Sequence, residues 1–574
     1  MPELKVSDYI AQFIAERGVT RVYELVGGMI THLIDSIQQD GRVELVSMRH
    51  EQAAAFAADA TGRLTGVPGV AMATSGPGAV NLLTGVGSCY LDSSPAVFLT
   101  GQVNRHEQKG TRPIRQLGFQ ETDIVAMAEP ITKAAIRVGS PEEVPGLLRW
   151  AFDHAVEGRP GPVLLDLPMD VQGSRIEVPA PDAREAPTRT LPRGEDIDAL
   201  LADLGRAERP MVLVGAGARA SQAIEPLRRL VERLGVPVVN SLLAVDALPY
   251  DHPMRFGLIG SYGNRWANMA VGRADFLLVL GSRLDIRQTG SEVEWFKGER
   301  VIHHVDIDPA EINNRVPGCR AVPADVGAYV EAVLERGEMA VPDYGAWVEE
   351  LVELRRSWPD TEEQRGTEGI NPNAFMHALS AGSRNASAYV VDVGQHQQWA
   401  AQSLELESHQ RFLTSGGMGA MGFGLPAAIG GSRALGGEVV MIAGDGSFQL
   451  NIQELETVVH GGLPIKLVVL DNGCHGMVRQ FQQAYFAERY QSTWWGYSAP
   501  DFVSVARAYG IDALRIENPD EISSGIDALW ANPRAPFLLQ VMIDPLANAY
   551  PKLAFGRPIT EMEPLATPVA MEGT

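Results

Sequence analysis

The feature that most constrains the fold of this chain is a pair of short motifs, Gly444-Asp445-Gly446 and Leu470-Asp471-Asn472. Residues 447–462 between them are long enough for a helix, and a continuous apolar run leads into the second motif. This order predicts strand, glycine turn, helix and strand, which together form one βαβ unit. Asp445 and Asn472 would then lie at the C-terminal ends of neighbouring parallel strands, where open α/β sheets bind ligands. A carboxylate and an amide oxygen there suit a hard cation such as Mg²⁺.

Length and charge limit the protein's organisation and its partners. The chain has 574 residues, which suggests about three domains of roughly 150–200 residues each. Its formal net charge is −23, which argues against nucleic acid or an anionic membrane as a partner. A small anionic substrate is still compatible with this charge, because a local pocket can oppose the overall field.

Cysteine spacing and the N-terminal segment point to a cytoplasmic protein. The three cysteines are widely spaced without a CxxC pair, which argues against a zinc site or a disulfide framework. The first residues (MPELKVSDYIAQFIAERG) predict an amphipathic helix rather than a leader peptide. No apolar run reaches the roughly 18 residues of a membrane span. We therefore expect small-molecule substrates and neither nucleic acid nor a membrane as partner.

Short apolar runs alternate with helical stretches in three blocks, which predicts an α/β protein with three doubly wound parallel-sheet domains. Segments rich in proline and charge at 179–194 and at about 338–372 are expected to connect them. The expected domains span residues 1–178, 195–337 and 368–550, followed by a C-terminal tail at 551–574.

The chain resembles thiamine diphosphate enzymes from about residue 4 to residue 560, and residues 444–490 are most similar to the acetohydroxyacid synthase group. The resemblance implies a pyrimidine-binding domain, a central FAD-binding-type domain and a diphosphate-binding domain, in that order. It also implies that the side chains of Asp445 and Asn472 bind Mg²⁺, with the backbone carbonyl of Cys474 as third protein ligand.

Glu51 stands in the segment HEQAAAFAADATGR, at the start of an expected Ala-rich helix. A carboxylate at this position can simply stabilise the helix dipole, and the zincin pattern that begins at His50 fails because residue 54 is Ala. The resemblance implies instead that Glu51 hydrogen-bonds the aminopyrimidine, whose reactive chemistry the protein positions. Ser75 and Gly76, after an expected strand, would pack against the same ring.

Three further residues of the first block gain a role only from the resemblance. Gly28 lies in a glycine turn after an expected strand, and would make close backbone contacts beside the substrate. Gln120 would line the active site, and Phe119 would border the acceptor pocket. On their own these motifs indicate no more than a turn and a loop.

The third block supplies the remaining contacts to the cofactor. Backbone N–H groups that follow the expected strand ending at Asp392 suit a diphosphate. The resemblance implies that the Gly419 carbonyl accepts from the cofactor's amino group, and that Met421 holds the cofactor in a bent shape that brings its reacting atoms together. The implied cofactor-binding residues of this block are Gly394, Gln395, His396, Gly419, Met421, Gly444, Gly446 and Ser447.

The middle block contains Gly215-Ala216-Gly217, which fits a dinucleotide-binding turn. NAD is disfavoured, because the next expected strand ends in Asn240 where an acidic residue would bind the ribose. The block resembles the FAD-binding domain of acetohydroxyacid synthases, some relatives of which lost FAD but kept the domain. We expect FAD here, bound by Gly215, Gly217, Arg283, Asp306 and Ile307.

Three positions concern the second substrate. Arg287 matches the arginine that binds the carboxylate of the second 2-keto acid, although a surface salt bridge would be its ordinary role. Phe481 stands where biosynthetic synthases carry Trp, and Ser261 where they carry Met. Apolar contacts of this kind discriminate acceptors by roughly 1–3 kcal/mol each, so a larger or more hydroxylated acceptor is expected.

The resulting prediction is a carboligase that depends on thiamine diphosphate, Mg²⁺ and FAD. It would decarboxylate pyruvate and add the two-carbon unit to pyruvate, another 2-keto acid or a larger ketone such as a keto-sugar. The resemblance implies a cofactor shared between subunits, hence a homodimer or homotetramer. A thiamine-dependent decarboxylase or oxidase is the alternative. A non-catalytic regulatory relative is disfavoured, because Glu51, Asp445 and Asn472 are all present.

Overall fold

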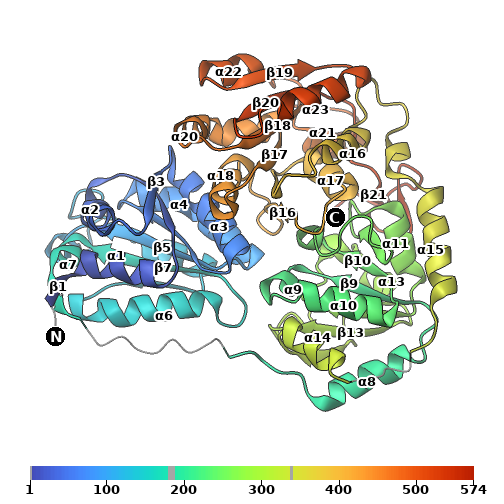
Figure 1. Cartoon of the computed structure of the whole chain (residues 1–574), viewed down its shortest axis with the longest axis horizontal. Coiled ribbons are helices and arrows are strands. Elements are labelled where there is room, and N and C mark those ends of the chain that lie inside the picture. The colour runs from blue at the N-terminus through green and yellow to red at the C-terminus, as the bar shows by residue number, and fades with distance from the viewer. Residues whose placement is uncertain (1–2, 179–187, 337–340, 574) are drawn as a thin grey trace.

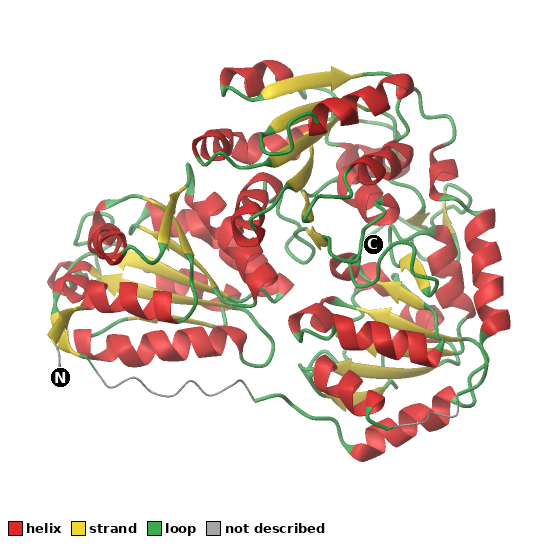
Figure 2. Ribbon diagram, in the orientation of Figure 1, coloured by secondary structure: helices red, strands yellow, loops and turns green. Residues whose placement is uncertain are grey.

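The structure is a computed structural model that describes residues 3–178, 188–336 and 341–573. Three six-stranded parallel sheets with helices on both faces make up most of it (Figures 1 and 2). This confirms the predicted fold class. The expected connectors at 179–194 and 338–372 lie partly outside the described residues. No helix within the described ranges combines the length and the apolarity that a membrane crossing needs.

The first sheet has the strand order β3-β2-β4-β5-β7-β6. Its strands are β2 (Arg21–Leu25), β3 (Glu44–Ser47), β4 (Gly69–Ala73), β5 (Ala96–Gln102), β6 (Ala134–Arg137) and β7 (Pro162–Pro168). Its main helices are α1 (Val6–Glu16), α2 (Thr31–Asp40), α3 (Glu51–Thr65), α4 (Pro77–Asp92), α5 (Ile124–Ala128) and α6 (Val144–Val156). Strands β4, β5 and β7 are buried throughout and mostly apolar, as a parallel sheet covered on both faces requires.

The third sheet repeats this strand order as β16-β15-β17-β18-β20-β19. Its strands are β15 (Ala388–Val391), β16 (Arg411–Leu413), β17 (Val439–Gly444), β18 (Ile465–Asp471), β19 (Asp512–Ile516) and β20 (Phe537–Met542). Its main helices are α16 (Pro372–Gly382), α17 (Gln395–Ser403), α18 (Gly424–Leu435), α21 (Gly476–Tyr485), α22 (Phe502–Ala508) and α23 (Ile522–Trp530). The first and third units are therefore two copies of one topology.

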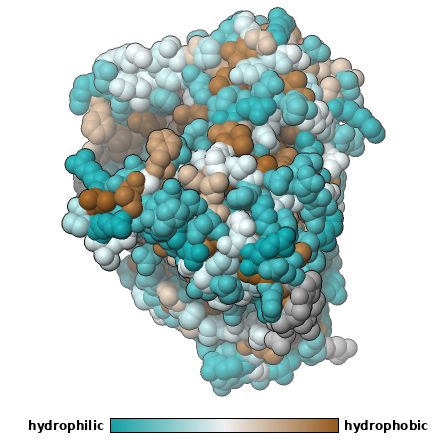
Figure 3. All heavy atoms as spheres, turned by 90° about the vertical axis from the view of Figure 1, so that its left-hand side faces the viewer, coloured by the Kyte–Doolittle hydropathy of each residue, from teal (hydrophilic) through white to brown (hydrophobic). Residues whose placement is uncertain are grey.

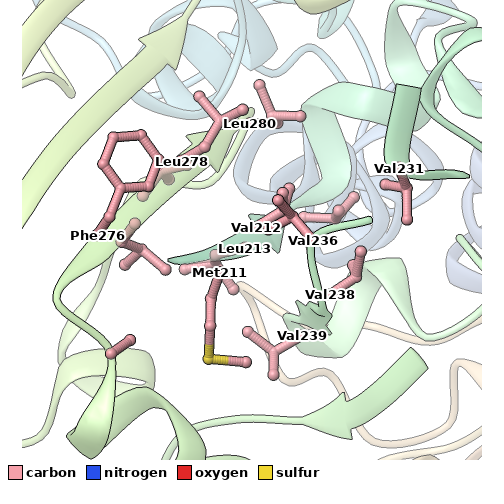
Figure 4. Packing of buried hydrophobic residues seen from close by; sticks show 14 of the residues in the cluster. Met211, Val212, Leu213, Val231, Val236, Val238, Val239, Phe276, Leu278 and Leu280 are labelled. Carbon is pink, nitrogen blue, oxygen red and sulfur yellow. The ribbon is translucent and has the colours of Figure 1, made fainter. Parts of the chain in front are cut away.

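The middle sheet has the order β11-β10-β9-β12-β13-β14, which is the dinucleotide-binding order 3-2-1-4-5-6. Its strands are β9 (Pro210–Val214), β10 (Val238–Asn240), β11 (Arg255–Leu258), β12 (Phe276–Leu280), β13 (Val301–Asp306) and β14 (Arg320–Pro323). Its main helices are α8 (Gly194–Leu204), α9 (Ala216–Ala220), α10 (Ile224–Leu234), α11 (Arg265–Arg273) and α14 (Val326–Leu334). Figure 4 shows how Met211, Leu213, Val239 and Phe276 pack within its core.

The predicted βαβ unit is present, but its helix is not continuous. β17 and β18 pair in parallel with Gly444 opposite Leu470, as expected. The connection consists of α19 (Asp445–Phe448), η7 (Gln449–Glu454) and α20 (Leu455–His460). The single helix predicted at 447–462 was wrong, because Asn451 leaves helical geometry (φ −133°, ψ 28°). Its amide donates to the Gly422 carbonyl oxygen at 2.7 Å and to Gln52 Oε1 at 3.1 Å.

Helix α3 packs directly against α18, which joins the first and third units through a shared apolar core. The approach is close because α3 is rich in alanine and α18 presents a glycine. A Cβ on Gly430 would overlap the carbonyl oxygen of Ala57. The neighbouring Gly431 has only ordinary contacts, with Leu64 at 3.5 Å and Val390 at 3.9 Å from such a Cβ.

These two glycines give a matched test of the α3–α18 contact. Gly430→Ala should destabilise the protein by about 1–3 kcal/mol, because the new methyl group meets backbone that cannot move aside. Gly431→Ala should be neutral or stabilising by up to about 1 kcal/mol, because alanine favours the helix. Thermal unfolding of both variants measures the difference. Equal effects would show that the close approach at Gly430 does not limit packing.

Candidate active site

The predicted cofactor loops of the first and third units follow strands at equivalent places. In open α/β sheets, ligands bind at the C-terminal ends of strands where the strand order reverses. In the first sheet this place lies between β2 and β4, which are followed by Gly28 and by Ser75-Gly76. In the third sheet it lies between β15 and β17, followed by Gly394 and Asp445. Topology thus brings each predicted loop to a ligand-binding edge.

Three oxygen atoms of the predicted metal ligands lie together beyond β17 and β18. Asn472 Oδ1 is 3.2 Å from Asp445 Oδ1 and 2.8 Å from the carbonyl oxygen of Cys474. With the Asp445 carboxyl group ionised, none of the three can donate a hydrogen bond to another. Ligands of an octahedral Mg²⁺ ion, at about 2.0–2.1 Å from the metal, lie about 2.9 Å apart. The observed spacing therefore fits a hard cation bound by all three oxygens.

This oxygen cluster differs from sites built only from His, Cys, Asp and Glu side chains. No group of three such side chains that could hold a metal occurs among residues 3–178, 188–336 and 341–573. The candidate site uses one carboxylate, one amide and one backbone carbonyl instead. Such a small set matches Mg²⁺, which usually completes its shell with substrate phosphates and water.

Asp445 lies in surroundings that favour a neighbouring cation. Burial and the nearby Asp471 carboxylate raise the pKa of Asp445 to about 7. Tyr497 donates to Asp445 Oδ2 at 2.7 Å, which leaves Oδ1 for the cluster. The next residue, Gly446, has no room for a side chain, because a Cβ there would lie 2.8 Å from the ring of His475. Sequence patterns gave no signal for Tyr497, which reaches the site from a distant loop.

The turn at the start of α17 combines backbone donors with an imidazole that has one unpaired nitrogen. Burial lowers the pKa of His396 to about 3, so its ring is neutral. His396 Nε2 is buried and has no hydrogen-bond partner in the structure. Cβ atoms on Gly394 and Gly444 would lie within 3 Å of this ring, at 2.5 and 2.9 Å. Ser447 closes the neighbouring turn by accepting from the Gly444 N–H at 3.1 Å.

Asp392 holds the glycine-rich segment that precedes α18. Its carboxylate accepts hydrogen bonds from the N–H groups of Val393 (2.7 Å), Gly422 (3.0 Å) and Gly424 (2.8 Å). Burial raises the pKa of Asp392 to about 6. The segment carries the predicted residues Gly419, whose φ of +64° favours glycine, and Met421, which is partly exposed. The sequence gave no signal for this role of Asp392 beyond its position at a strand end.

Glu51 is the first residue of α3 and is buried. Asn81 donates to its Oε2 at 3.0 Å, and a Cβ on Gly78 would lie 3.1 Å from Oε1. The carboxyl group is therefore enclosed by α4 and the turn after β4. In the same turn, Ser75 Oγ is buried without a hydrogen-bond partner. Glu51 therefore lies where a carboxylate stabilises the helix dipole, and its buried carboxyl group also lies beside the turn that is expected to contact a ligand.

The edge of the first unit that carries these residues is open in a single chain. The side chain of Phe119 is 79% exposed, and Gly28 is exposed as well. Gln120, with a φ of +65°, lies against Gly76. Figure 3 views the molecule from the left-hand side of Figure 1, where the first unit lies, and hydrophobic side chains reach the surface on this face among hydrophilic ones. The other exposed large apolar residues of these loops and of α5 are Val26, Ile114, Leu117 and Met127.

The middle sheet brings its predicted glycines to its own reversal point, between β9 and β12. A Cβ on Gly217 would lie 2.7 Å from Gly281 Cα, and Gly217 N–H donates to the Gly281 carbonyl oxygen at 2.9 Å. Gly215 is packed against the same turn. Such a glycine cradle lets a dinucleotide approach the backbone. β10 ends in Asn240, as the sequence predicted.

Three predicted residues lie near the glycine cradle. Arg283 pairs with Asp285 at 3.2 Å and stays partly exposed. Asp306 ends β13, and burial raises its pKa to about 6. Ile307 follows it and is partly exposed. These residues occupy the C-terminal edge of the sheet, beside the cradle.

The predicted acceptor residues are linked through the C-terminal segment. Ser261 N–H donates to the Arg287 carbonyl oxygen at 2.6 Å, and the Ser261 carbonyl oxygen accepts from Leu553 N–H at 2.8 Å. The Arg287 guanidinium lies 5.9 Å from the Tyr262 ring. Phe481 packs against Tyr485 with ring centres 4.8 Å apart.

Lys552 interacts both with Tyr262, next to Arg287, and with Tyr485, next to Phe481. Its amine lies 5.3 Å from the Tyr485 ring and pairs with Glu563 at 3.4 Å and with Glu572 at 3.3 Å. The same amine interacts electrostatically with Tyr262. Sequence patterns did not indicate Lys552 or Tyr262, because Lys552 lies in a two-residue strand (Lys552–Leu553) and Tyr262 in a turn.

Comparisons with known proteins agree with this geometry. Residues 4–127 match the family described as thiamine pyrophosphate enzyme, N-terminal TPP binding domain. Residues 197–333 match the central domain and residues 392–541 the C-terminal TPP binding domain of the same enzymes. This chain belongs to the thiamine pyrophosphate enzyme family. The two matched binding domains contain the open edge around Glu51 and the oxygen cluster at Asp445.

Several members of this family are similar to this chain over almost its whole length. The probable acetolactate synthase large subunit of Methanocaldococcus jannaschii is 36% identical over 97% of this chain and 95% of its own length. The acetolactate synthase isozyme 2 large subunit of Escherichia coli strain K12 is 37% identical over 97% and 98%. An acetolactate synthase of Mycobacterium bovis is 34% identical over 98% and 92%. The predicted resemblance is thereby confirmed.

The hydrogen bonds of Asp392 predict a specific defect in this thiamine pyrophosphate enzyme. Asp392→Asn should weaken thiamine diphosphate binding about tenfold or more, because an amide cannot accept from N–H groups on both sides. Titration calorimetry measures the affinity. The control is Asp501→Asn, which alters an exposed helix cap that accepts from Val503 N–H at 3.2 Å. Unchanged binding by Asp392→Asn would show that this anchor does not shape the site.

Proposed function

We propose that this protein is a thiamine diphosphate- and Mg²⁺-dependent carboligase that transfers the two-carbon unit of pyruvate to a carbonyl acceptor. The observation that carries the proposal is the cluster of three acceptor oxygens from Asp445, Asn472 and Cys474. It stands at the diphosphate-binding edge of a chain whose relatives are named acetolactate synthases. Thiamine diphosphate supplies the nucleophilic carbon on which pyruvate loses carbon dioxide.

The residues of the third unit would bind the charged end of the cofactor. Asp445, Asn472 and the Cys474 carbonyl would hold Mg²⁺, and the turns at Gly394 and Gly444 would offer N–H groups to the diphosphate. The neutral imidazole of His396 has a free nitrogen for a further hydrogen bond. Gly446 and Ser447 keep this turn narrow enough for close backbone approach.

Glu51 would bind the other end of the cofactor. Its buried carboxyl group, oriented by Asn81, can hold a proton at the ring nitrogen of the aminopyrimidine. Ser75 and Gly76 would pack beside the ring, Gly419 would accept from its amino group, and Met421 would support the bent shape. The side chains of Phe119 and Gln120 and the backbone of Gly28 would exclude water around the bound pyruvate.

We propose FAD as a third ligand, bound by the middle unit. The 3-2-1-4-5-6 strand order and the cradle of Gly215, Gly217 and Gly281 support a dinucleotide. Asn240 at the end of β10 argues against NAD. Arg283, Asp306 and Ile307 would complete the FAD site. Its role would be structural, because the proposed reaction involves no net oxidation.

Product analysis tests the proposed function. The protein is incubated with thiamine diphosphate, Mg²⁺, FAD and pyruvate, with and without a panel of aldehydes, ketones and keto-sugars. We expect acetolactate or a two-carbon adduct of an added acceptor. Acetaldehyde alone would identify a decarboxylase, and acetate with bleaching of bound FAD would identify an oxidase. Either result would contradict the carboligase.

The group around Arg287 predicts which residues select the acceptor. The double variant Ser261→Met, Phe481→Trp should raise the preference for pyruvate over a bulky ketone by about tenfold to 200-fold, because it restores apolar contacts. Competition between the two acceptors measures the ratio. Arg287→Gln should reduce acetolactate formation and spare adducts of uncharged ketones. An unchanged ratio in the double variant would exclude these positions as determinants.

We also propose a homodimer or homotetramer in which one subunit's first unit faces another subunit's third unit. The exposure of Phe119 and its apolar neighbours supports this assembly, because a partner subunit would cover these side chains. The relatives' designation as large subunits also supports association with further subunits.

Subunit complementation tests the shared site. Glu51→Gln and Asp445→Asn should each be inactive. After co-refolding in equal amounts, mixed dimers would contain one intact site, so about a quarter of wild-type activity should return. A site contained in one chain would give no recovery. The separately refolded variants serve as controls.

A further inference from the structure

Gln395, at the start of α17, makes contacts that its expected role at the diphosphate does not explain. Its Oε1 accepts a hydrogen bond from Asn472 Nδ2 at 3.0 Å. Its Nε2 donates to the carbonyl oxygen of Ala547 at 3.0 Å and to Gln480 Oε1 at 3.2 Å. The side chain is buried. One amide thus joins the oxygen cluster, helix α21 and the chain that follows β20.

The carbonyl of Ala547 determines which way round the Gln395 amide lies. A backbone carbonyl can only accept, so its partner must be Nε2. Oε1 of Gln395 then faces Asn472, and Asn472 must present its own Nδ2. This places Asn472 Oδ1 toward Asp445 Oδ1 and the Cys474 carbonyl oxygen. The orientation of the asparagine is therefore set by a main-chain group outside the cluster.

The opposite orientation of Asn472 would satisfy the other two oxygens of the cluster without any cation, although it would lose the hydrogen bond from Cys474 N–H to Asn472 Oδ1 at 3.3 Å. After a half-turn, Nδ2 would donate to Asp445 Oδ1 at 3.2 Å and to the Cys474 carbonyl oxygen at 2.8 Å. The same half-turn would place Oδ1 against Gln395 Oε1, which is also an acceptor. Two acceptors in contact in a buried site are unfavourable. Gln395 therefore opposes the one orientation in which Asn472 could not bind a metal.

Gly476 provides the space that this arrangement needs. A Cβ at position 476 would overlap Gln395 Oε1 and would lie 2.6 Å from Asn472 Nδ2. Its φ is not positive, so the backbone itself does not require glycine. The absence of a side chain at Gly476 is therefore explained by the hydrogen bond between Gln395 and Asn472.

We propose that Gln395 is a positioning residue for the metal site, which holds the amide oxygen of Asn472 toward the cation. The inference rests on the Mg²⁺ site of the proposed function. It assigns the Gln395 side chain to the metal loop, and leaves only its backbone N–H for the diphosphate. Partners that orient metal ligands in this way typically contribute a factor of about 10–100 to affinity.

The test is the affinity for Mn²⁺, titrated by electron paramagnetic resonance with thiamine diphosphate in excess. Gln395→Leu should weaken Mn²⁺ binding about 10–100-fold. Gln398→Leu is the matched control, because Gln398 is buried on the same helix and its amide donates only to Gln397 Oε1 in the hydrogen bonds observed. It should bind Mn²⁺ like the wild type. Gly476→Ala should weaken binding while Gln395 itself is retained.

The same titration in an Asn472→Asp background separates orientation from general structure. A carboxylate presents oxygen on both sides, so its orientation needs no control. Adding Gln395→Leu to Asn472→Asp should therefore cause no further loss of Mn²⁺ affinity, and can raise it because a carboxylate oxygen no longer faces Gln395 Oε1. Equal losses in both backgrounds, or no loss in Gln395→Leu or Gly476→Ala, would overturn the inference. Absence of Mn²⁺ binding by the wild type would instead overturn the proposed metal site.

Discussion

Three oxygen atoms that cannot hydrogen-bond one another once Asp445 is ionised lie together where β17 and β18 end, and the rest of the site is arranged around them. The parallel register of Gly444 with Leu470 brings Asp445 and Asn472 to one edge. Gln395 and Tyr497 each occupy the remaining polar atom of one ligand. A cation bound between these acceptor oxygens would offset their mutual repulsion, and it would also bind the oxygens of a diphosphate.

The first and third units share one strand order, and their roles follow from which residues stand at the reversal point. In the third unit the turns carry glycines, backbone donors and the oxygen cluster, which suit the charged end of a cofactor. In the first unit they carry Glu51, Ser75 and Gly76, which suit a heteroaromatic ring. Contact between α3 and α18 joins the units, but it leaves the edge near Phe119 open.

The sequence predicted the parts of the fold and site that depend on local pattern. Apolar runs ending in Gly-Asp-Gly or Asp-Asn predicted the strands and turns, and the structure has them there. It could not predict the break at Asn451, since the break depends on Gly422 and Gln52, which are distant in sequence. The roles of Asp392, Tyr497, Lys552 and the Gln395 side chain were missed for the same reason, because their partners meet only in the folded chain.

The most direct measurement is anomalous scattering from a crystal grown with thiamine diphosphate and Mn²⁺. The account predicts one strong peak within bonding distance of Asp445, Asn472 and the Cys474 carbonyl oxygen, with diphosphate oxygens completing the shell. A cofactor bound at this edge with its metal held by other residues, or Mn²⁺ bound only elsewhere, would contradict it.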